Sequence, residues 1–183
     1  MARHYPGNVA EPAPAFAPPV LLTEAHDRSQ FESGEPVLDD WLRQRTWENM
    51  QLGASRTYVV CQAGSHRVAG YFALSMGQIL AAEVTAPVRR NMPRQIPAVV
   101  FGRLAIDRAW QGKGLGQALL AEVIRRSALA SSQVAARLVI VHALSAAAEA
   151  YYLYHGFTRL PVGTPTLALD LTKLQKIDPE AQQ

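Results

Sequence analysis

The sequence of 183 residues contains a single cysteine, Cys61, and no long apolar run. One thiol cannot form an intrachain disulfide, so a disulfide-stapled scaffold is excluded and a reducing compartment is expected. No stretch approaches the ~20 consecutive apolar residues that cross a bilayer. Prolines interrupt the apolar residues near the N-terminus, which argues against a signal peptide. We therefore expect a soluble cytoplasmic protein that does not engage a membrane.

Acidic residues are scarce in one region, and this scarcity concentrates positive charge there. The chain as a whole is 49% hydrophobic and 18% charged, with a net charge of +3. Between Thr85 and Lys113, six cationic side chains accompany a single aspartate, Asp107. Two interpretations stay open: a solvated surface that at most serves a cofactor, or a surface for a nucleic-acid backbone. The six are Arg89, Arg90, Arg94, Arg103, Arg108 and Lys113.

Composition and periodicity predict one folded domain between two tails. Residues 1–19 hold five of the twelve prolines and are expected to be a flexible Ala/Pro-rich tail, and residues 172–183 a loose polar tail. Residues 20–171 predict a mixed α/β sheet with helices on its faces. The expected strands are Val20–Leu22, Thr57–Cys61, Val68–Met76 (prolonged by Gln78–Val84), Ala98–Ile106, Leu138–His142 and Thr166–Leu171. The expected helices are Pro36–Met50, Leu115–Ala130 and Ala146–His155, and residues 87–97 are expected to be irregular.

A glycine-rich turn, Gln111-Gly112-Lys113-Gly114-Leu115-Gly116, joins the expected central strand to the next helix. The free N–H groups of a first helical turn and the positive end of its dipole favour an anion, and glycines let a phosphate approach the main chain. Gln117 follows where a P-loop needs Lys and a Rossmann fingerprint needs Gly, so both loops are excluded. The pattern that remains is Gln/Arg-x-x-Gly-x-Gly/Ala.

This pattern, between an apolar strand and a helix, resembles motif A of the GNAT (Gcn5-related N-acetyltransferase) superfamily. The run Tyr152-Leu153-Tyr154-His155-Gly156-Phe157 resembles its motif B helix. The strand Gly102-Arg103-Leu104-Ala105-Ile106-Asp107 is similar to that of GNAT toxins from bacterial toxin–antitoxin modules, and the likeness runs from about Val20 to Leu171. The resemblance implies the GNAT fold, with a mostly antiparallel sheet whose strands splay at the acetyl-CoA site.

The resemblance also implies acetyl-CoA as co-substrate and assigns roles to residues. The pyrophosphate would bind the turn, Arg108 and Lys113 would add charge, and the splayed strand would bond the pantetheine. Tyr152 is the expected general acid for the departing CoA sulfur, because Tyr151 and Tyr154 point in other helical directions. The expected cofactor-binding residues are Leu104, Ala105, Ile106, Arg108, Gln111, Gly112, Lys113, Gly114, Leu115 and Gly116.

On the acceptor side, the resemblance implies a toxin that acetylates the α-amino group of aminoacyl-tRNA, forms a homodimer and is neutralised by a ribbon-helix-helix antitoxin. Arg89, Arg90 and Arg94 are expected to contact the tRNA backbone, and Arg103 either the acceptor or a structural ion-pair partner. The central strand carries no carboxylate base, which suits an α-amine with a pKa of ~7.7–8.0 better than a lysine at ~10.4.

Three further expectations complete the sequence-based picture. No metal site is expected, since neither His142 nor His155 has a partner at metal-ligand spacing. Asp107 is interpreted as a turn or capping residue, and Glu149 as an exposed one. Two other functions stay open: an N-acetyltransferase of a small amine or a protein N-terminus, and a catalytically silent acyl-CoA-binding module.

Overall fold

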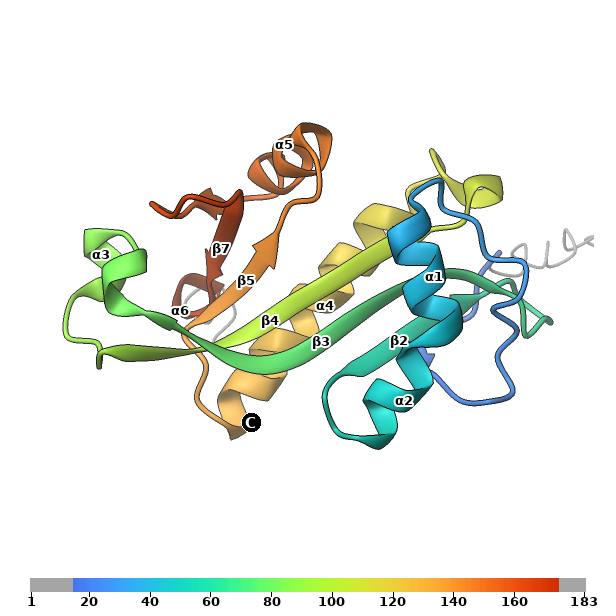
Figure 1. Cartoon of the computed structure of the whole chain (residues 1–183), viewed down its shortest axis with the longest axis horizontal. Helices are drawn as coiled ribbons and strands as arrows, with labels where there is room; N and C mark the ends of the chain where they lie inside the picture. Colours follow the sequence, from blue (N-terminus) through green and yellow to red (C-terminus); the bar gives the residue numbers. More distant parts are fainter. Residues whose placement is uncertain (1–14, 175–183) are drawn as a thin grey trace, which may run out of the picture.

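The computed structural model describes residues 15–174, in which seven strands form one mixed sheet (Figure 1). The strand order is β1-β2-β3-β4-β5-β7-β6, and within this range only β4 and β5 pair in parallel. The expected mixed, mostly antiparallel sheet is confirmed. The strands are β1 (Val20–Leu21), β2 (Arg56–Cys61), β3 (Val68–Leu80), β4 (Gln95–Ile106), β5 (Leu138–His142), β6 (Thr158–Arg159) and β7 (Thr166–Asp170).

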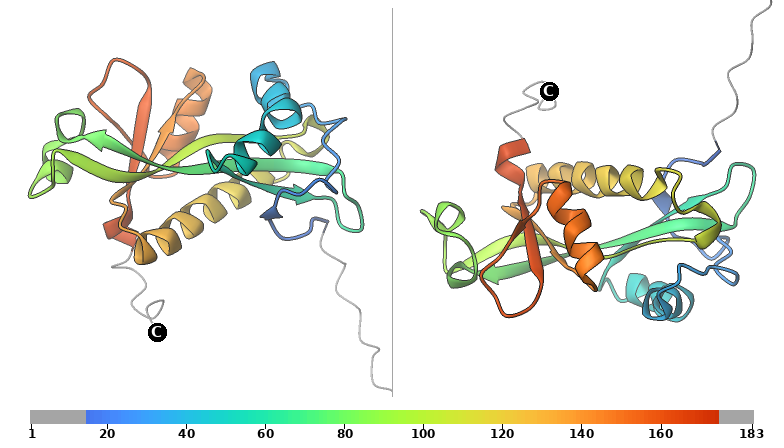
Figure 2. Two further views of the ribbon diagram at one scale, coloured as in Figure 1. Left: turned by 60° about the horizontal axis from the view of Figure 1, so that its bottom comes forward. Right: turned by 90° about the horizontal axis from the view of Figure 1, so that it is seen from above.

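Helices cover both faces of the sheet (Figure 2). On one face, α1 (Pro36–Gln44) buries Trp41 and Leu42 against Tyr71 of β3. On the other, the long α4 (Leu115–Gln133) buries one apolar stripe against the sheet. Such stripes predict helices because residues three and four apart share a helix face. The remaining helices are α2 (Thr46–Gln51), α3 (Ala86–Arg89), α5 (Ala146–Tyr154) and α6 (Leu171–Leu174), with 3-10 turns η1 (Ala81–Glu83) and η2 (Arg108–Trp110).

The single helix predicted over Pro36–Met50 is wrong, since the structure has two helices there. Arg45, between α1 and α2, has φ −114° and ψ −24°. The Thr46 hydroxyl donates to the Leu42 carbonyl at 2.7 Å, which is the acceptor that a continuous helix would offer to the Thr46 N–H. The side chain thus competes with the helix ladder at the point where the chain bends.

β3 and β4 form one long hairpin, and the glycine-rich turn follows the end of β4. The prediction that Gln78–Val84 prolongs its strand is confirmed as far as Leu80, where β3 ends, and it is wrong beyond, because Ala81–Glu83 form η1. β4 begins at Gln95, before the predicted Ala98, and Gln95 pairs with Leu80. The connection, with η1 and α3, lies at one end of β4, and the glycine-rich turn follows its other end (Figure 1).

The ordered region reaches past both predicted boundaries, since it includes residues 15–19 and residues 172–174. Phe16 forms a bridge with Gln62 and meets the Trp110 ring edge-on at 5.1 Å, so residues 15–19 pack on the domain. At the other end, α6 extends to Leu174 and Leu171 is buried. The remainder of the two tails, 1–14 and 175–183, lies outside the described residues. No helix within residues 15–174 is long and apolar enough to span a bilayer.

Candidate active site

β4 and β5 separate in the middle of the sheet. β4 pairs with β5 from Ala98 to Phe101, and from Gly102 onward it pairs with β3 alone. Opposite Ala73 and Leu74, the ladder skips Gly102, so this glycine is an extra residue that bends β4 away. The predicted splay is therefore present, and it exposes one edge of β4.

The open edge offers the backbone groups of alternate residues. Asp107 N–H donates to the Ala69 carbonyl at 2.9 Å, so Asp107 faces β3. Alternation along an antiparallel ladder turns Leu104 and Ile106 toward the open edge and Ala105 toward its β3 partner, Tyr71. Of the three strand residues predicted to bond the cofactor through their backbone, Leu104 and Ile106 thus face the open edge, while the backbone groups of Ala105 are directed to β3. The sequence does not reveal the register of β4 with β3, and this register decides which backbone groups face the open edge.

The glycine-rich turn forms a preorganised anion site. Gly112 and Gly114 have φ of 72° and 82°, the left-handed region, and Gly114 is the N-cap of α4. The six consecutive N–H groups from Gly112 to Gln117 donate to no acceptor within residues 15–174. They stand at the positive end of a helix of 19 residues. Such an arrangement of free N–H groups at a helix N-terminus favours an anion such as a phosphate.

Gln111 braces this turn instead of facing the anion site with its side chain. Its Nε2 donates to the Ile106 carbonyl at 2.9 Å and to the Ser33 carbonyl at 2.7 Å. The first bond closes the turn onto the end of β4, and the second ties it to the segment before α1. The Gln111 side chain thus shapes the turn, and the predicted contact of the turn with the cofactor through its N–H groups stays a prediction.

The two cations predicted to add charge at the turn are both engaged elsewhere. Arg108 Nη1 lies 2.7 Å from Glu32 Oε1 in an exposed ion pair. Lys113 Nζ donates to the Ala109 carbonyl at 3.1 Å and sits 4.7 Å from the centre of the Trp110 ring. In this structure neither side chain aims a free charge at the N–H groups, so the main chain supplies most of the attraction for an anion.

Tyr152 stands on α5 beside the point where β4 leaves β5. Ser145 caps this helix by accepting from Ala148 N–H at 3.1 Å, and Gly156, at φ 89°, ends it. The Tyr152 ring meets Phe101 edge-on at 5.7 Å, and its hydroxyl has no hydrogen-bond partner among the described residues. Burial, with a smaller contribution from Tyr151, raises the pKa of Tyr152 to about 12. The phenol is therefore protonated at neutral pH, as a general acid must be.

Tyr151 is the residue that sequence reasoning missed. Its hydroxyl is buried without a hydrogen-bond partner in the described part of the chain. It lies 3.8 Å from where a Cβ on Gly116 would stand, beside the first turn of α4. Tyr154, by contrast, is 86% exposed. No spacing in the sequence signals the approach of Tyr151 to Gly116, because the two lie on separate helices.

No carboxylate near Tyr152 is free to act as a base in the described structure. Asp107 is buried and accepts from the N–H groups of Ala109 at 3.0 Å and Glu32 at 3.2 Å, which confirms its capping role. Glu149 is partly buried and forms an ion pair with Arg159, so its predicted exposure is wrong. Within residues 15–174, no three His, Cys, Asp or Glu side chains converge as metal ligands.

The basic stretch predicted from the sequence is divided in space. Arg89, Arg90 and Arg94 are exposed around α3 and make no ion pair with any described residue. Arg108 lies past the far end of β4, roughly 40 Å away at about 3.3 Å per strand residue. Arg103 lies between them, with its guanidinium 4.3 Å from the centre of the Trp41 ring and not in the ion pair considered as an alternative.

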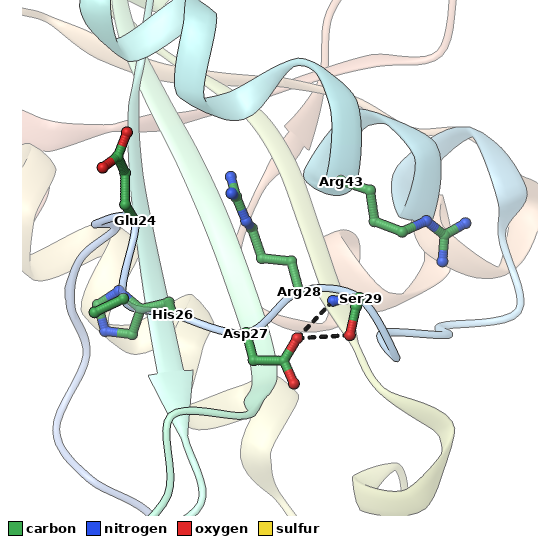
Figure 3. A pocket seen from close by; sticks show the side chains of 7 residues that line it. Glu24, His26, Asp27, Arg28, Ser29 and Arg43 are labelled. Atoms are coloured by element: carbon green, nitrogen blue, oxygen red, sulfur yellow. Dashed lines mark hydrogen bonds between the residues drawn. The ribbon is translucent and has the colours of Figure 1, made fainter.

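A separate hollow lies on the loop before α1 and carries no acetyl-transfer groups (Figure 3). Its lining comes from residues 24–29 and Arg43. Asp27 Oδ1 accepts from the Ser29 N–H and hydroxyl, while Arg43 donates to Phe31 O and Asp40. Asp27 and Arg43 are thus already hydrogen-bonded within the loop and α1, and we assign this hollow no role.

Comparison with known proteins agrees with this geometry. Residues 54–159 match the family described as an acetyltransferase (GNAT) domain. A tRNA-acetylating toxin of Mycobacterium tuberculosis is 40% identical over 161 residues, covering 88% of this chain and 93% of the relative.

Two solved structures share the fold over nearly their whole length. AtaT complexed with acetyl-methionyl-tRNAfMet has a TM-score of 0.82 and 26% identity, covering 88% of this chain and 98% of that one. A mutant of the AtaT toxin bound to the C-terminus of the antitoxin AtaR has a TM-score of 0.76 and 26% identity, covering 90% and 98%. The open edge of β4, the preorganised turn and these matches lead to one conclusion: the chain belongs to the GNAT acetyltransferase family.

Proposed function

We propose that this acetyltransferase is a toxin that acetylates the α-amino group of aminoacyl-tRNA and thereby blocks translation. The observation that carries the proposal is the 40% identity, over 88% of the chain, to a tRNA-acetylating toxin. Acetyl-CoA is the co-substrate. The site geometry supports the donor half of the reaction, and the free arginines around α3 support the acceptor half.

The donor binds along the open edge in this proposal. The pyrophosphate oxygens accept hydrogen bonds from the N–H groups of the turn, from Gly112 to Gln117. The pantetheine arm follows the free edge of β4 and bonds Leu104 and Ile106, whose backbone groups face outward. This path carries the thioester toward Tyr152, because Tyr152 packs against Phe101 at the start of the splay.

The reaction then needs one attack on the thioester carbonyl and a set of proton transfers that returns Tyr152 to its acid form. The amine nitrogen attacks the thioester carbonyl, the carbon–sulfur bond breaks, and the CoA sulfur takes the proton of the Tyr152 hydroxyl. The proton of the attacking amine leaves to water, and water returns one proton to the Tyr152 phenolate, so the acid is restored for the next turnover. A CoA thiol resembles cysteine, with a pKa near ~8.5, so a thiolate is a tolerable leaving group and the acid contributes at the lower end of ~100- to 10,000-fold.

Among residues 15–174, no free carboxylate lies near Tyr152, and this favours an acceptor amine that is already partly neutral. An α-amine with a pKa of ~7.7–8.0 is unprotonated in about a tenth of molecules at pH 7, whereas a lysine amine is almost wholly charged. The amino group of an aminoacyl ester therefore suits this site without a dedicated base.

Arg89, Arg90 and Arg94 are proposed to hold the tRNA backbone. Changing all three to Ala should weaken tRNA binding and reduce the slope of log K against log salt by about 2 to 3, since each phosphate contact contributes ~0.7–0.9. The melting temperature should not change, because the three side chains are exposed and unpaired in the described structure. Binding measured from low to moderate salt reports the slope.

The matched control changes the same three arginines to Lys. Lysine keeps the charge, so the slope should stay near that of the wild type if backbone charge alone is recognised. If the triple Ala variant keeps the salt slope of the wild type, these arginines are solvated surface residues and do not contact the tRNA.

The proposed reaction is tested directly with radiolabelled acetyl-CoA and total charged tRNA. We expect label on aminoacyl-tRNA, released as an N-acetyl amino acid by mild alkaline hydrolysis of the ester. Label on a small amine or a protein N-terminus instead would favour the alternative N-acetyltransferase. Uncharged tRNA is the control, because it has no α-amine and should stay unlabelled.

We also propose a cognate antitoxin of the ribbon-helix-helix type, a homodimer and a cytoplasmic location. The AtaT–AtaR structure supports the first idea for a relative of this fold. Charged tRNA is a cytoplasmic substrate, which supports the third. Sequencing of the flanking DNA tests for a small ribbon-helix-helix gene, whose co-expression should relieve growth arrest, and light scattering measures the oligomeric state.

A further inference from the structure

Tyr151 carries a hydroxyl that the apo protein leaves unused. The oxygen is buried and makes no hydrogen bond with any residue between 15 and 174. A buried hydroxyl without a partner costs about 1–3 kcal/mol, so an orphan of this kind in a native structure calls for an explanation. Its surroundings supply one.

The hydroxyl reaches from α5 to the start of α4. It would lie 3.8 Å from a Cβ on Gly116, the second residue of α4. Gly116 N–H is one of the six main-chain donors of the turn that have no acceptor in the described structure. The Tyr151 hydroxyl therefore lies beside the first turn of α4, the turn whose N–H groups also lack an acceptor in the described structure.

A ligand shared by these groups must be an acceptor. Backbone N–H groups can only donate, and burial raises the pKa of Tyr151, so its hydroxyl keeps its proton. The structure holds no hydrogen bond between the hydroxyl and the N–H groups. An oxyanion with several lone pairs can accept from both at once.

We propose that the Tyr151 hydroxyl donates a hydrogen bond to the pyrophosphate of acetyl-CoA, beside the N–H groups at the start of α4. Tyr151 is then a cofactor-binding residue, distinct in role from Tyr152 on the same helix. This proposal rests on acetyl-CoA binding at the turn, and it does not depend on the identity of the acceptor.

The bond would also fix α5 against α4 when the cofactor is bound. The Tyr151 and Tyr152 rings meet edge-on with centroids 5.6 Å apart. A pyrophosphate that holds Tyr151 therefore also limits the motion of the neighbouring general acid.

The test is Tyr151→Phe, which keeps the ring and its contacts with Tyr152 and His155. Calorimetry measures binding of two ligands in the absence of any acceptor: CoA, and pantetheine, which lacks the pyrophosphate. We expect the dissociation constant for CoA to rise about tenfold, equal to about 1.4 kcal/mol, and that for pantetheine to stay unchanged.

The melting temperature of the free protein separates this role from a structural one. Removing an unsatisfied hydroxyl should leave the apo melting temperature unchanged or raise it, while the stabilisation by CoA falls. Tyr154→Phe, on the exposed side of α5, is the matched control and should change none of these quantities. Unchanged CoA affinity, an equal loss for CoA and pantetheine, or a lower apo melting temperature would each overturn the proposal. Absence of tRNA acetylation would leave it standing, because both ligands are measured without an acceptor.

Discussion

Tyr152→Phe is expected to lower kcat by about 100-fold or more while the dissociation constant for acetyl-CoA stays the same. The hydroxyl has no hydrogen-bond partner within the described protein, so its removal breaks no internal bond. The phenylalanine ring keeps the contacts with Phe101 and Phe157. What is lost is the proton for the CoA sulfur, a contribution of ~100- to 10,000-fold for a positioned acid. Steady-state kinetics and calorimetry together separate turnover from binding.

The pH dependence provides a second measurement on the same residue. Because the pKa of Tyr152 is raised to about 12, the acid form persists through neutral and mildly alkaline pH. The rate of the wild type should therefore rise with deprotonation of the acceptor amine and show no loss of acid near pH 10, the ordinary range of tyrosine. Unchanged turnover in Tyr152→Phe would remove this tyrosine from the mechanism.

The raised pKa also sets how stability depends on pH. The folded protein holds the Tyr152 proton more tightly than the unfolded chain does. The contribution of this group is therefore fully present below about pH 10 and is lost as pH rises toward 12. Alkaline unfolding of the wild type should begin in that window, and Tyr152→Phe should weaken this part of the pH dependence.

Gly114→Val is expected to reduce acetyl-CoA affinity by about 100-fold or more. Gly114 has φ 82° and nothing lies within 4 Å of the position of an added Cβ, so the penalty is conformational and not a clash. A β-branched residue is strained in the left-handed region by roughly 1–2 kcal/mol and would pull the turn out of shape. The N–H groups would then no longer converge, and hydrogen bonds to a charged phosphate are worth about 1.5–3 kcal/mol each.

Gly53→Val is the matched control for this variant. Gly53 also has positive φ, 71°, with open space around its Cβ position, but it lies in the turn that follows α2. Both variants should lose similar stability in thermal unfolding, and only Gly114→Val should lose acetyl-CoA binding in calorimetry. Equal affinity in the two variants would show that the turn geometry does not determine cofactor binding.

Local patterns explain why most elements were predictable. The helix that carries Tyr152 is bounded by a Ser cap and a Gly stop, both of which act within one turn of chain. The anion turn likewise depends on glycines and on the helix that directly follows them. The prediction of one helix over residues 36–50 is wrong because a hydroxyl at Thr46 competes for a single carbonyl, a choice that periodicity does not report.

For the site residues, too, the features that the sequence did not predict are those that depend on contacts between distant segments. Arg108 was expected to serve the cofactor, yet its partner Glu32 lies 76 residues away in the chain. Ala105 was grouped with Leu104 and Ile106, yet the register with β3 turns it the other way. A stretch that reads as one basic region is divided because an extended strand moves its ends far apart.

The sequence by itself determined the main helices and strands, the glycine turn before α4, and the cap and stop of the helix that carries Tyr152, because each depends on residues a few positions apart. Only the tertiary structure decided which backbone groups of β4 are free, where the arginines lie and that Tyr151 meets Gly116. These depend on strand register, on the bulge at Gly102 and on contacts between separate helices. Such contacts follow from how the whole chain packs, and no local pattern encodes them.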